Sequence, residues 1–591
     1  MPGEAVGFEA EGRLPARRRH AAGALLALGV PLFASPALAE PSLSALELRP
    51  AAPSQSPSLS SGTGVPDAGA GLVSSGPFVL PPAADTGRVR LDAPDFPYGA
   101  VAPPPGEPGR GWAVTPSLGV QFLYTDNLDQ SRRDKRDDFV TSIIPGLLLS
   151  VDTDRIRGLI NYAPSIQFHT AEGERNRVDQ RFNGQALITV VPDQVFLDLR
   201  GSGATQAASG GYAGQGNAVV GRNNRVQTNT VQVSPYFVQR FGGLGTVQVG
   251  YAFQAVQQDL GGSGFGGGSS GGAFTPGGQR YFADQDFTAH EFYAVGRTGE
   301  NFGRLAFETR LASTSYDGTG VLDGAYKRIA SVQARYAITH SILALVEGGY
   351  EGQRYGGVPG IHISEPVWAF GGRVNFSPES WITVKYGRRD GFNSATVDAV
   401  IGLGVRTQLF ANYSERLTTG AQRAVDLLST TTLDEYGNPV DSATGAPTAQ
   451  PFSDSLLGVQ SSLFRIRRAA LSVSQSWPRD RITLTVSHEE RQPVSVQAGT
   501  TAFSQRGTSA SLSWSHELTP ATTAIGNVQY GRFTSPGAGN GDVVSASVTL
   551  ATQLRPGLSA FAQYAITSRG DEDASGRALQ NVVLVGLRQT F

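Results

Sequence analysis

Histidine is the first residue type to examine for chemistry, because its ring binds metals and titrates near neutral pH. The seven histidines are His20, His169, His290, His340, His362, His488 and His516. None has a metal-ligand spacing such as HExxH, and no GxSxG motif stands at a predicted strand-to-helix turn. The best local cluster is Asp284, Asp286 and His290, at the entry to a predicted strand, where polar residues are expected anyway. We therefore predict no enzyme and no cofactor.

Two loops carry unusual compositions. The loop DNLDQSRRDKRDD (126–138) mixes acidic and basic residues, so it could bind a divalent cation or lipopolysaccharide phosphates, or be an ordinary solvated loop. The tract GGSGFGGGSSGG (261–272) is not followed by GK[ST], which argues against a phosphate-binding P-loop. We predict that it is a mobile loop.

A set of basic residues occupies the polar faces of predicted strands. If those faces line a lumen, the basic residues outnumber the carboxylates of Asp198, Glu308, Glu347 and Glu351. Rings of basic side chains favour anions in a pore. We predict an anion-preferring lumen; the alternative is that these side chains pair with loop carboxylates and fill it. The predicted lumen-lining residues are Arg155, Arg157, Arg200, Arg304, Arg310, Arg335, Arg373, Lys385, Arg389, Arg468 and Arg588.

The elements that must position these residues are strands. Period-two alternation of apolar and polar residues is clear in 155–169, 246–256, 381–389 and 481–487, and it recurs to the C-terminus. Short turns such as 152–154 alternate with longer polar loops, which is the plan of an outer-membrane barrel. After the first 39 residues no apolar run is long enough for a spanning helix. The pattern predicts a transmembrane antiparallel up-and-down β-barrel over 112–591, with about 22 strands and a range of 16 to 24.

The last strand, RALQNVVLVGLRQTF (577–591), has one apolar face and one more polar face and ends on Phe591. A C-terminal aromatic strand resembles the signal by which outer-membrane barrels are recognised for assembly, although Gln589 departs from that pattern. The alternative for this stretch alone is an edge strand of a soluble β-domain.

The composition limits the other possibilities. The chain has no cysteine, which excludes disulfides and thiol chemistry, and a formal net charge of -2, which gives no support to nucleic-acid binding. Residues 1–39 have the basic, apolar and Ala37-Leu38-Ala39 regions of a secretory signal peptide. Residues 40–111 are rich in Pro, Ala, Ser and Gly, which predicts a disordered periplasmic tail.

The first predicted strands carry a more specific resemblance. The matching residues are Tyr124-Thr125-Asp126-Asn127, Asp138-Phe139, Pro145-Gly146-Leu147, Tyr162 and Phe196-Leu197-Asp198. They resemble a family of outer-membrane barrels called putative β-barrel porin type 2, some of whose members are associated with exopolysaccharide export. The resemblance implies location in the cell outer membrane and a porin-like or export role, with no catalytic residues.

We therefore expect a porin-like outer-membrane channel, for exopolysaccharide export or for anionic solutes. The alternative is a structural or adhesive barrel with a plugged lumen. The expected partners are outer-membrane lipid and lipopolysaccharide, the barrel assembly machinery and polysaccharide export components, with no nucleic acid.

Overall fold

The computed structural model describes residues 111–207, 225–260, 272–274, 280–283, 285–377, 380–404, 406–433, 439–441, 456–535, 539–571 and 577–591. The predicted signal peptide, the predicted tail before Gly111, Asp284 and nearly all of the glycine tract lie outside these residues. Within the described ranges, no helix has the length and apolar character needed to cross a membrane.

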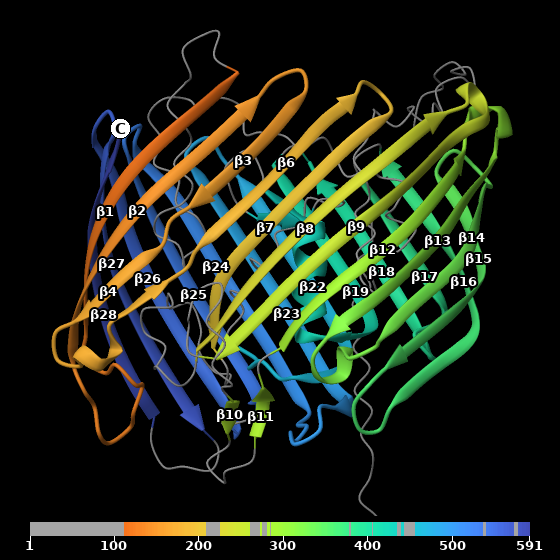
Figure 1. Cartoon of the computed structure of the whole chain (residues 1–591). Coiled ribbons are helices and arrows are strands. Elements are labelled where there is room, and N and C mark those ends of the chain that lie inside the picture. Colours follow the sequence, from red (N-terminus) through yellow and green to blue (C-terminus); the bar gives the residue numbers. More distant parts are fainter. Residues whose placement is uncertain are drawn as a thin grey trace, which may run out of the picture. The chain divides into compact units, whose positions relative to one another are not determined.

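A single antiparallel sheet forms the wall of the molecule (Figure 1). Its first half contains β1 (Trp112–Thr125), β2 (Asp138–Asp152), β3 (Ile156–Tyr162), β4 (Ser165–His169), β5 (Arg177–Asp179), β6 (Phe182–Val191), β7 (Val195–Ala207), β8 (Arg225–Arg240), β9 (Gly245–Leu260), β12 (Gln285–Thr298), β13 (Leu305–Gly318) and β14 (Tyr326–Ala337). The second half contains β15 (Ile342–Tyr355), β16 (Ile361–Ser377), β17 (Ser380–Arg389), β18 (Phe392–Leu403), β19 (Thr407–Thr419), β22 (Ser462–Ser476), β23 (Asp480–Val496), β24 (Gln505–Thr519), β25 (Thr522–Ser535), β26 (Gly539–Arg555), β27 (Leu558–Asp571) and β28 (Arg577–Thr590).

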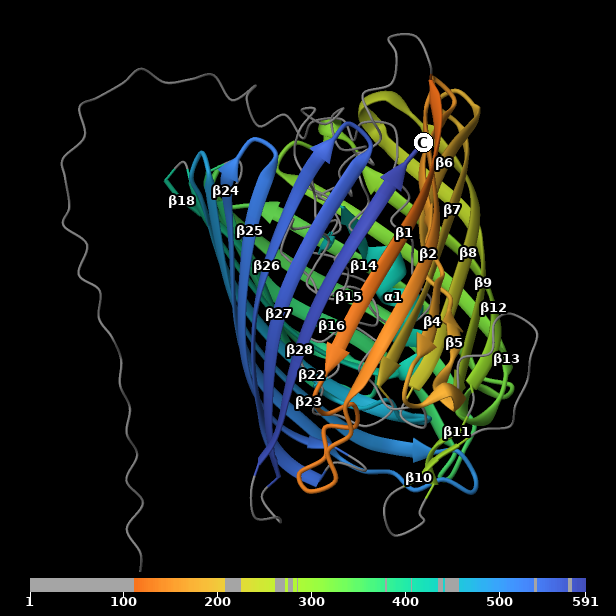
Figure 2. The same cartoon turned by 90° about the vertical axis from the view of Figure 1, so that its left-hand side faces the viewer.

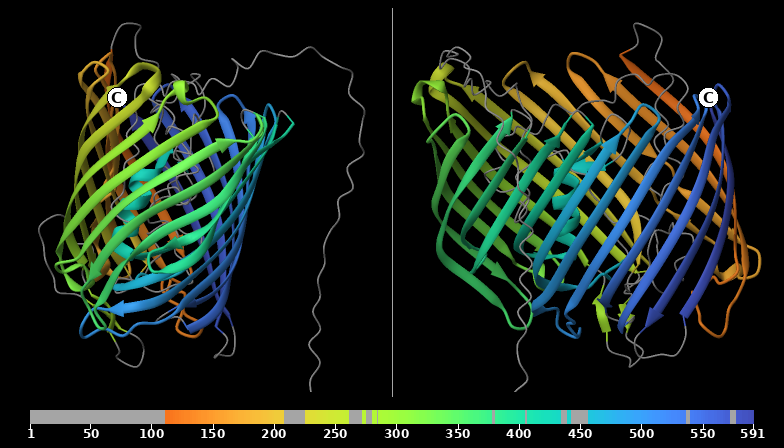
Figure 3. Two further views of the ribbon diagram at one scale, coloured as in Figure 1. Left: turned by 90° about the vertical axis from the view of Figure 1, so that its right-hand side faces the viewer. Right: turned by 180° about the vertical axis from the view of Figure 1, so that it is seen from behind.

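The sheet closes on itself, because β28 pairs with β1 from Ser117↔Thr590 to Thr125↔Val582 (Figure 2). The two further views show the same continuous wall from its other sides (Figure 3). Closure leaves the barrel with no unpaired edge strand, the condition for spanning a bilayer with strands. The predicted barrel strand over 577–591 is confirmed, and the alternative of an edge strand does not hold.

The barrel has 22 wall positions although 24 strands of the described chain belong to the sheet. The difference arises because β3 and β4 together fill one position beside β2, and β5 and β6 together fill the next. The predicted single strand 155–169 is interrupted at Ala163 and Pro164. Proline has no N–H to donate to the ladder, so the pairing is weakest at that point. The predicted fold class and the count of about 22 are confirmed.

The alternation of side chains places apolar residues outside and polar residues inside. On β28, Val583, Val585 and Leu587 are exposed on the outer face, whereas Gln580 and Arg588 are buried on the inner face. On β9, Val247 and Val249 face outward. An exterior of exposed aliphatic and aromatic side chains is what a barrel wall presents to lipid.

The two rims of the barrel differ in the length of their connections. At the rim where β28 ends, successive strands are joined by short turns, such as 153–155 between β2 and β3 and 556–557 between β26 and β27. At the opposite rim most connections are longer, such as 126–137 between β1 and β2 and 420–461 between β19 and β22, although 390–391 between β17 and β18 is a tight turn. This is the predicted alternation of short turns and long loops.

Smaller elements belong to the connections. Beyond the wall, the described residues form the helix α1 (Gly420–Thr430) and two short hairpins, β10 (Gly272–Phe274) with β11 (Arg280–Ala283) and β20 (Thr431–Leu433) with β21 (Pro439–Asp441). They also form the 3-10 turns η2 (Gly173–Arg175), η5 (Gly242–Leu244), η6 (Glu300–Phe302) and η7 (Gly320–Leu322). The helix α1 lies inside the barrel (Figures 2 and 3).

Candidate functional site: the barrel interior

The strand parity decides where each predicted lumen-lining residue points. Eight side chains project from inner faces of the wall: Arg200, Arg310, Arg335, Arg373, Lys385, Arg389, Arg468 and Arg588. Arg155 and Arg304 instead lie exposed in connections at the short-turn rim, just before β3 and β13 begin. Arg157 belongs to β3, but its side chain lies outside the part of the structure that is described.

A basic band runs along the inner wall of β12 to β17. Within it, Glu308 lies 3.4 Å from Arg297 and 3.4 Å from Arg335. Arg389 donates to Glu347 at 2.6 Å. Among the described inner-face residues of this band, cations exceed carboxylates. The cations are Arg297, Arg310, Lys327, Arg335, Arg373, Lys385 and Arg389, and the carboxylates are Glu291, Glu308, Glu347, Glu351 and Glu365.

Two further members of the basic band have neutral partners. The Nζ of Lys385 donates to Gln333 at 3.2 Å, and the Nε of Arg373 donates to Asn375 at 2.8 Å. The Arg373 guanidinium also lies 4.3 Å from the centre of the Trp381 ring. These neutral partners orient the two side chains and carry no charge of their own.

The helix α1 occupies space inside the barrel at the long-loop rim. Its Ala421 and Val425 join an apolar cluster with inward residues of the wall, including Tyr316 and Tyr355. Tyr355 is only 1% exposed, and the cluster also draws on β9, β12, β19 and β22. A core that joins wall strands on several sides to one helix narrows the bore at this rim.

Polar contacts tie α1 to opposite parts of the wall. Arg423 donates to both carboxylate oxygens of Glu489 on β23, at 2.6 and 2.9 Å. On another side, Arg200 of β7 donates to the Leu428 carbonyl at 3.3 Å. Arg416 of β19 reaches Asp426 at 3.5 Å. The end of the same connection packs Leu456 and Leu457 against inward residues of β25 and β26.

The inner wall of β22 to β26 has a different chemistry, because hydroxyl side chains line much of it, although Arg468 and Glu489 also face inward. Ser472 and Thr485 lie 2.7 Å apart across β22 and β23, and Ser487 and Ser509 lie 2.9 Å apart across β23 and β24. The row continues on β26 with Ser545, Ser547 and Thr549, all buried. Such a surface offers hydrogen bonds to a polar solute without fixing the sign of its charge.

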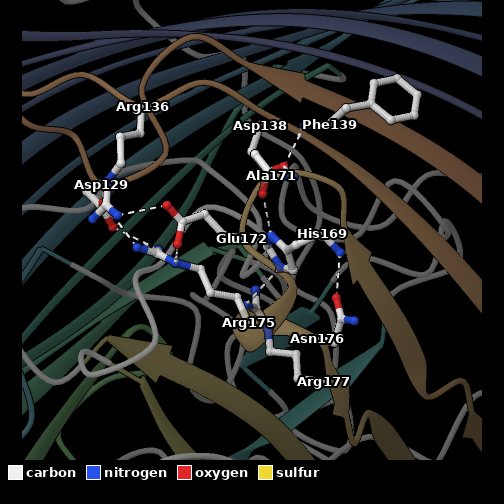
Figure 4. Close-up of polar contacts among 10 residues, drawn as sticks. All are labelled: Asp129, Arg136, Asp138, Phe139, His169, Ala171, Glu172, Arg175, Asn176 and Arg177. Atoms are coloured by element: carbon white, nitrogen blue, oxygen red, sulfur yellow. Dashed lines mark hydrogen bonds and ion pairs between the residues drawn. The ribbon is translucent and has the colours of Figure 1, made fainter.

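The mixed-charge loop 126–138 is held by ion pairs with the connection between β4 and β5 (Figure 4). Asp129 accepts from Arg136 at 2.7 Å and from Arg175 at 2.8 Å, and Arg136 also donates to Glu172 at 2.8 Å. Burial opposes ionisation of Asp129, but these two arginines outweigh it and hold its pKa below the usual value. The carboxylates therefore have protein partners, and no group of acidic or histidine side chains in the described ranges is arranged to hold a metal ion.

Beside this network, Asp138 begins β2 and His169 ends β4 (Figure 4). The Nδ1 of His169 and a carboxylate oxygen of Asp138 are 2.7 Å apart, and both side chains are fully buried. The same carboxylate accepts from the backbone N–H groups of Phe139 and Ala171, at 2.8 and 3.0 Å. A buried carboxylate with three partners fastens the two connections together.

The cluster singled out for histidine chemistry does not assemble on the inner face. His290 is exposed on the outer face of β12, where its Nδ1 lies 2.7 Å from the hydroxyl of Tyr251. Its ring packs against those of Tyr251 and Phe253. Asp286 is also exposed, and Asp284 lies outside the described residues. His290 is thus part of an outward aromatic group.

Two features of the interior were missed from the sequence, although signals for both exist. Ala421, Ala424, Val425 and Leu428 have the i, i+3, i+4, i+7 spacing of an amphipathic helix, and all four are buried. Strand parity likewise places Glu291 and Arg297 on the inner face of β12, because odd-numbered residues there are the more buried.

Comparisons with known proteins do not identify a family. No family model matches the chain, and no curated protein matches it, so the resemblance to putative β-barrel porin type 2 stays a prediction. Among solved structures the chain is similar to the ferric-catecholate receptor Fiu of E. coli K12 in its closed form, with a TM-score of 0.44 and 11% identity over 85% of this chain and 86% of that one. It is also similar to the FpvAI–pyocin S2 complex (TM-score 0.44, 11% identity, 82% of this chain and 71% of that one). A third similar structure is the FrpB iron transporter of Neisseria meningitidis, with a TM-score of 0.43 and 9% identity over 82% of this chain and 82% of that one.

Proposed function

We propose that this protein is an outer-membrane channel for small anionic solutes, with a bore that α1 and its flanking residues narrow at the long-loop rim. The observation that carries the proposal is the basic band on β12 to β17, inside a closed barrel with an apolar exterior. Basic side chains on a wall around an aqueous path lower the electrostatic energy of a passing anion.

The proposed location in the outer membrane has support on the outer surface. Glu415, Arg467 and Glu490 form a charged ladder over β19, β22 and β23, with Arg467 at 2.8 Å from Glu415 and 3.5 Å from Glu490. On β23 this ladder lies beyond the exposed apolar pair Leu484 and Val486, towards the long-loop rim. Charged outer side chains beside an apolar belt mark the level of lipid headgroups, and lipopolysaccharide is the partner we propose there.

Export of an exopolysaccharide is a narrower form of the same proposal. The hydroxyl-lined wall of β22 to β26 would bond sugar hydroxyls, and the basic band would attract acidic sugar groups. Polysaccharide export components would then be partners at the short-turn rim. The barrel assembly machinery is proposed to recognise β28 through Phe591, which is 74% exposed.

One observation favours a second candidate, a structural or adhesive barrel with a filled lumen. The apolar cluster around Val425 and Tyr355 is well buried, and its exposure to water would cost free energy. In this case the long connections would do the binding, and the bore would not conduct solutes.

Single-channel recording in a planar bilayer separates the two candidates. The purified, refolded barrel should give discrete openings, and a salt gradient should give a reversal potential of the sign for anions. Cation selectivity would contradict the basic band as the selectivity element. A folded, heat-modifiable barrel that stays silent would favour the structural candidate.

A further inference from the structure

Arg310 stands out in the basic band because its side chain has no hydrogen-bond partner among the residues that the structure describes. Its side chain is 6% exposed, and its Nε is buried without an acceptor. Among the described residues, neither Glu308 nor Glu347 forms an ion pair with Arg310. Glu308 instead pairs with Arg297 and Arg335, and Glu347 pairs with Arg389. Buried charges are normally paired, so an unpartnered guanidinium is an incomplete site.

The strand register shows what lies beside Arg310. Arg310 of β13 pairs with Ser331 of β14, which pairs with Gly349 of β15, which pairs with Val367 of β16. Arg389 of β17 follows Arg388, the partner of Trp368, and so lies at the end of the same row. The two arginines therefore stand at the ends of one row of inward positions. Between them are Ser331, Gly349 and the buried Val367, and a serine hydroxyl is both donor and acceptor.

Gly349 matters for the space in this row. A Cβ built there would lie 2.3 Å from the Ala330 carbonyl oxygen and 2.7 Å from Ser331, so the close approach of these strands requires glycine. Without a side chain at 349, nothing projects from β15 between the two arginines. The inner wall next to Ser331 therefore has no side chain at position 349.

Charged neighbours of both signs surround Arg310. Arg310 lies within electrostatic range of Arg297 and Arg389 as well as Glu308 and Glu347, and Glu291 is a further carboxylate nearby. These carboxylates are engaged by other donors, since Gln254 also lies 3.5 Å from Glu291. An oxyanion with several acceptor oxygens would satisfy Arg310 and Ser331 together.

We propose that the inner wall of β13 to β15 holds a specific site for a small oxyanion of the phosphate, sulfate or carboxylate class, with Arg310 as its principal ligand and Ser331 and Arg389 beside it. This inference rests on the proposed anion channel and names the point in the bore where the solute binds. It also explains why a guanidinium is retained in a buried position without a protein acceptor.

The test is equilibrium binding of inorganic phosphate to the full-length barrel in detergent, measured by calorimetry in a chloride background. We expect saturable binding of one phosphate per barrel. Arg310→Gln should weaken it about tenfold or more, the loss of a charge-assisted hydrogen bond. The matched control is Arg335→Gln, an equally buried arginine of the same band that is already paired with Glu308, and it should change affinity about threefold or less.

The site would be overturned if the parent protein showed no saturable phosphate binding, or if Arg310→Gln bound phosphate as the parent does. Equal losses of affinity in Arg310→Gln and Arg335→Gln would also overturn it, because they would indicate only the general electrostatic field of the basic band. Heat-modifiable migration checks that each variant is folded, and Arg310→Lys, which keeps the charge, should retain part of the affinity. Conductance is recorded separately. Phosphate binding by a silent barrel would keep the site and reject the channel, whereas anion-selective current without saturable binding would keep the channel and reject the site.

Discussion

The contact of Arg423 with Glu489 makes the narrowing of the bore testable with one substitution. Arg423 is the side chain by which α1 reaches β23, through two short charge-assisted hydrogen bonds. Both side chains are mostly buried, with 13% and 8% of their surfaces exposed. The Arg423→Ala variant removes this tether and leaves the apolar contacts of Ala421 and Val425 in place.

The free-energy cost of Arg423→Ala depends on the hydrogen-bond and charge partners that Glu489 retains. After the substitution Glu489 still accepts from Arg491 at 2.6 Å and still pairs across strands with Arg468, so no buried charge is abandoned. The loss is then that of hydrogen bonds to a charged group, about 1.5 to 3 kcal/mol. If closing of α1 onto the wall depends on this tether, the ratio of open to closed states should rise about tenfold to a hundredfold.

The assay is the open probability of single channels in a planar bilayer, compared with the parent protein at the same voltage. Glu490→Gln is the matched control, because it alters the next residue of the same strand on the outer face. We expect Arg423→Ala to stay open longer, or to pass a larger current, and Glu490→Gln to behave like the parent. Identical open probability in Arg423→Ala and the parent would refute the reasoning, and so would an equal change in the control.

Three other predictions concern the wall and the loops. Val548→Arg puts a charge on the lipid-facing side of β26, where Val548 is 62% exposed. It should reduce the unfolding free energy in vesicles by about 2 to 4 kcal/mol if the residue lies near the bilayer midplane. The control Ser547→Asn, on the inner face, should change the unfolding free energy far less, and similar losses in the two variants would mean that the faces are assigned wrongly. Deletion of Phe591 should reduce the fraction of heat-modifiable, folded barrel in cells without preventing refolding in detergent, and normal assembly in cells would count against the signal. Asp129 has a lowered pKa in the folded state, so its ion pairs stabilise the loop above the unfolded-state pKa of about 3.9 and are lost as pH falls through the lower folded value. Hydrogen exchange at the Leu128 amide, which bonds the Arg136 carbonyl at 2.7 Å, should therefore stay slow at neutral pH and lose protection in Asp129→Asn; equal protection in the two proteins would show that Asp129 does not hold the loop.

Alternation of side chains was enough to predict the barrel and most of its inner face. Lys385 and Arg588 lie where period-two counting placed them, because a closed sheet forces successive side chains to opposite faces. Arg155 and Arg304 lie in connections instead, because the last residue of a turn and the first of a strand have the same local pattern. The position of Arg310 between Val295 and Ser331 depends on pairing between three strands, which no single segment of sequence contains.

The interior was the harder part to predict. The connection between β19 and β22 reads as a long polar loop, and its helical spacing becomes meaningful only when a surrounding wall supplies apolar partners. Tyr355 and Trp381 lie near strand ends, where barrels carry outward aromatic girdles, but both are buried on the inner face. Aromatic residues near strand ends suit either face, so parity, not residue type, decides between them.

The even number of wall positions has a practical consequence for experiments on cells. The strand β1 begins and β28 ends at the same rim, so both chain ends of the barrel belong to one compartment. The connection 319–325 between β13 and β14 belongs to the other compartment. A protease recognition sequence inserted into 319–325 should be cut on intact cells, and one placed directly before Trp112 only after the envelope is opened; the opposite result would invert the barrel in the membrane.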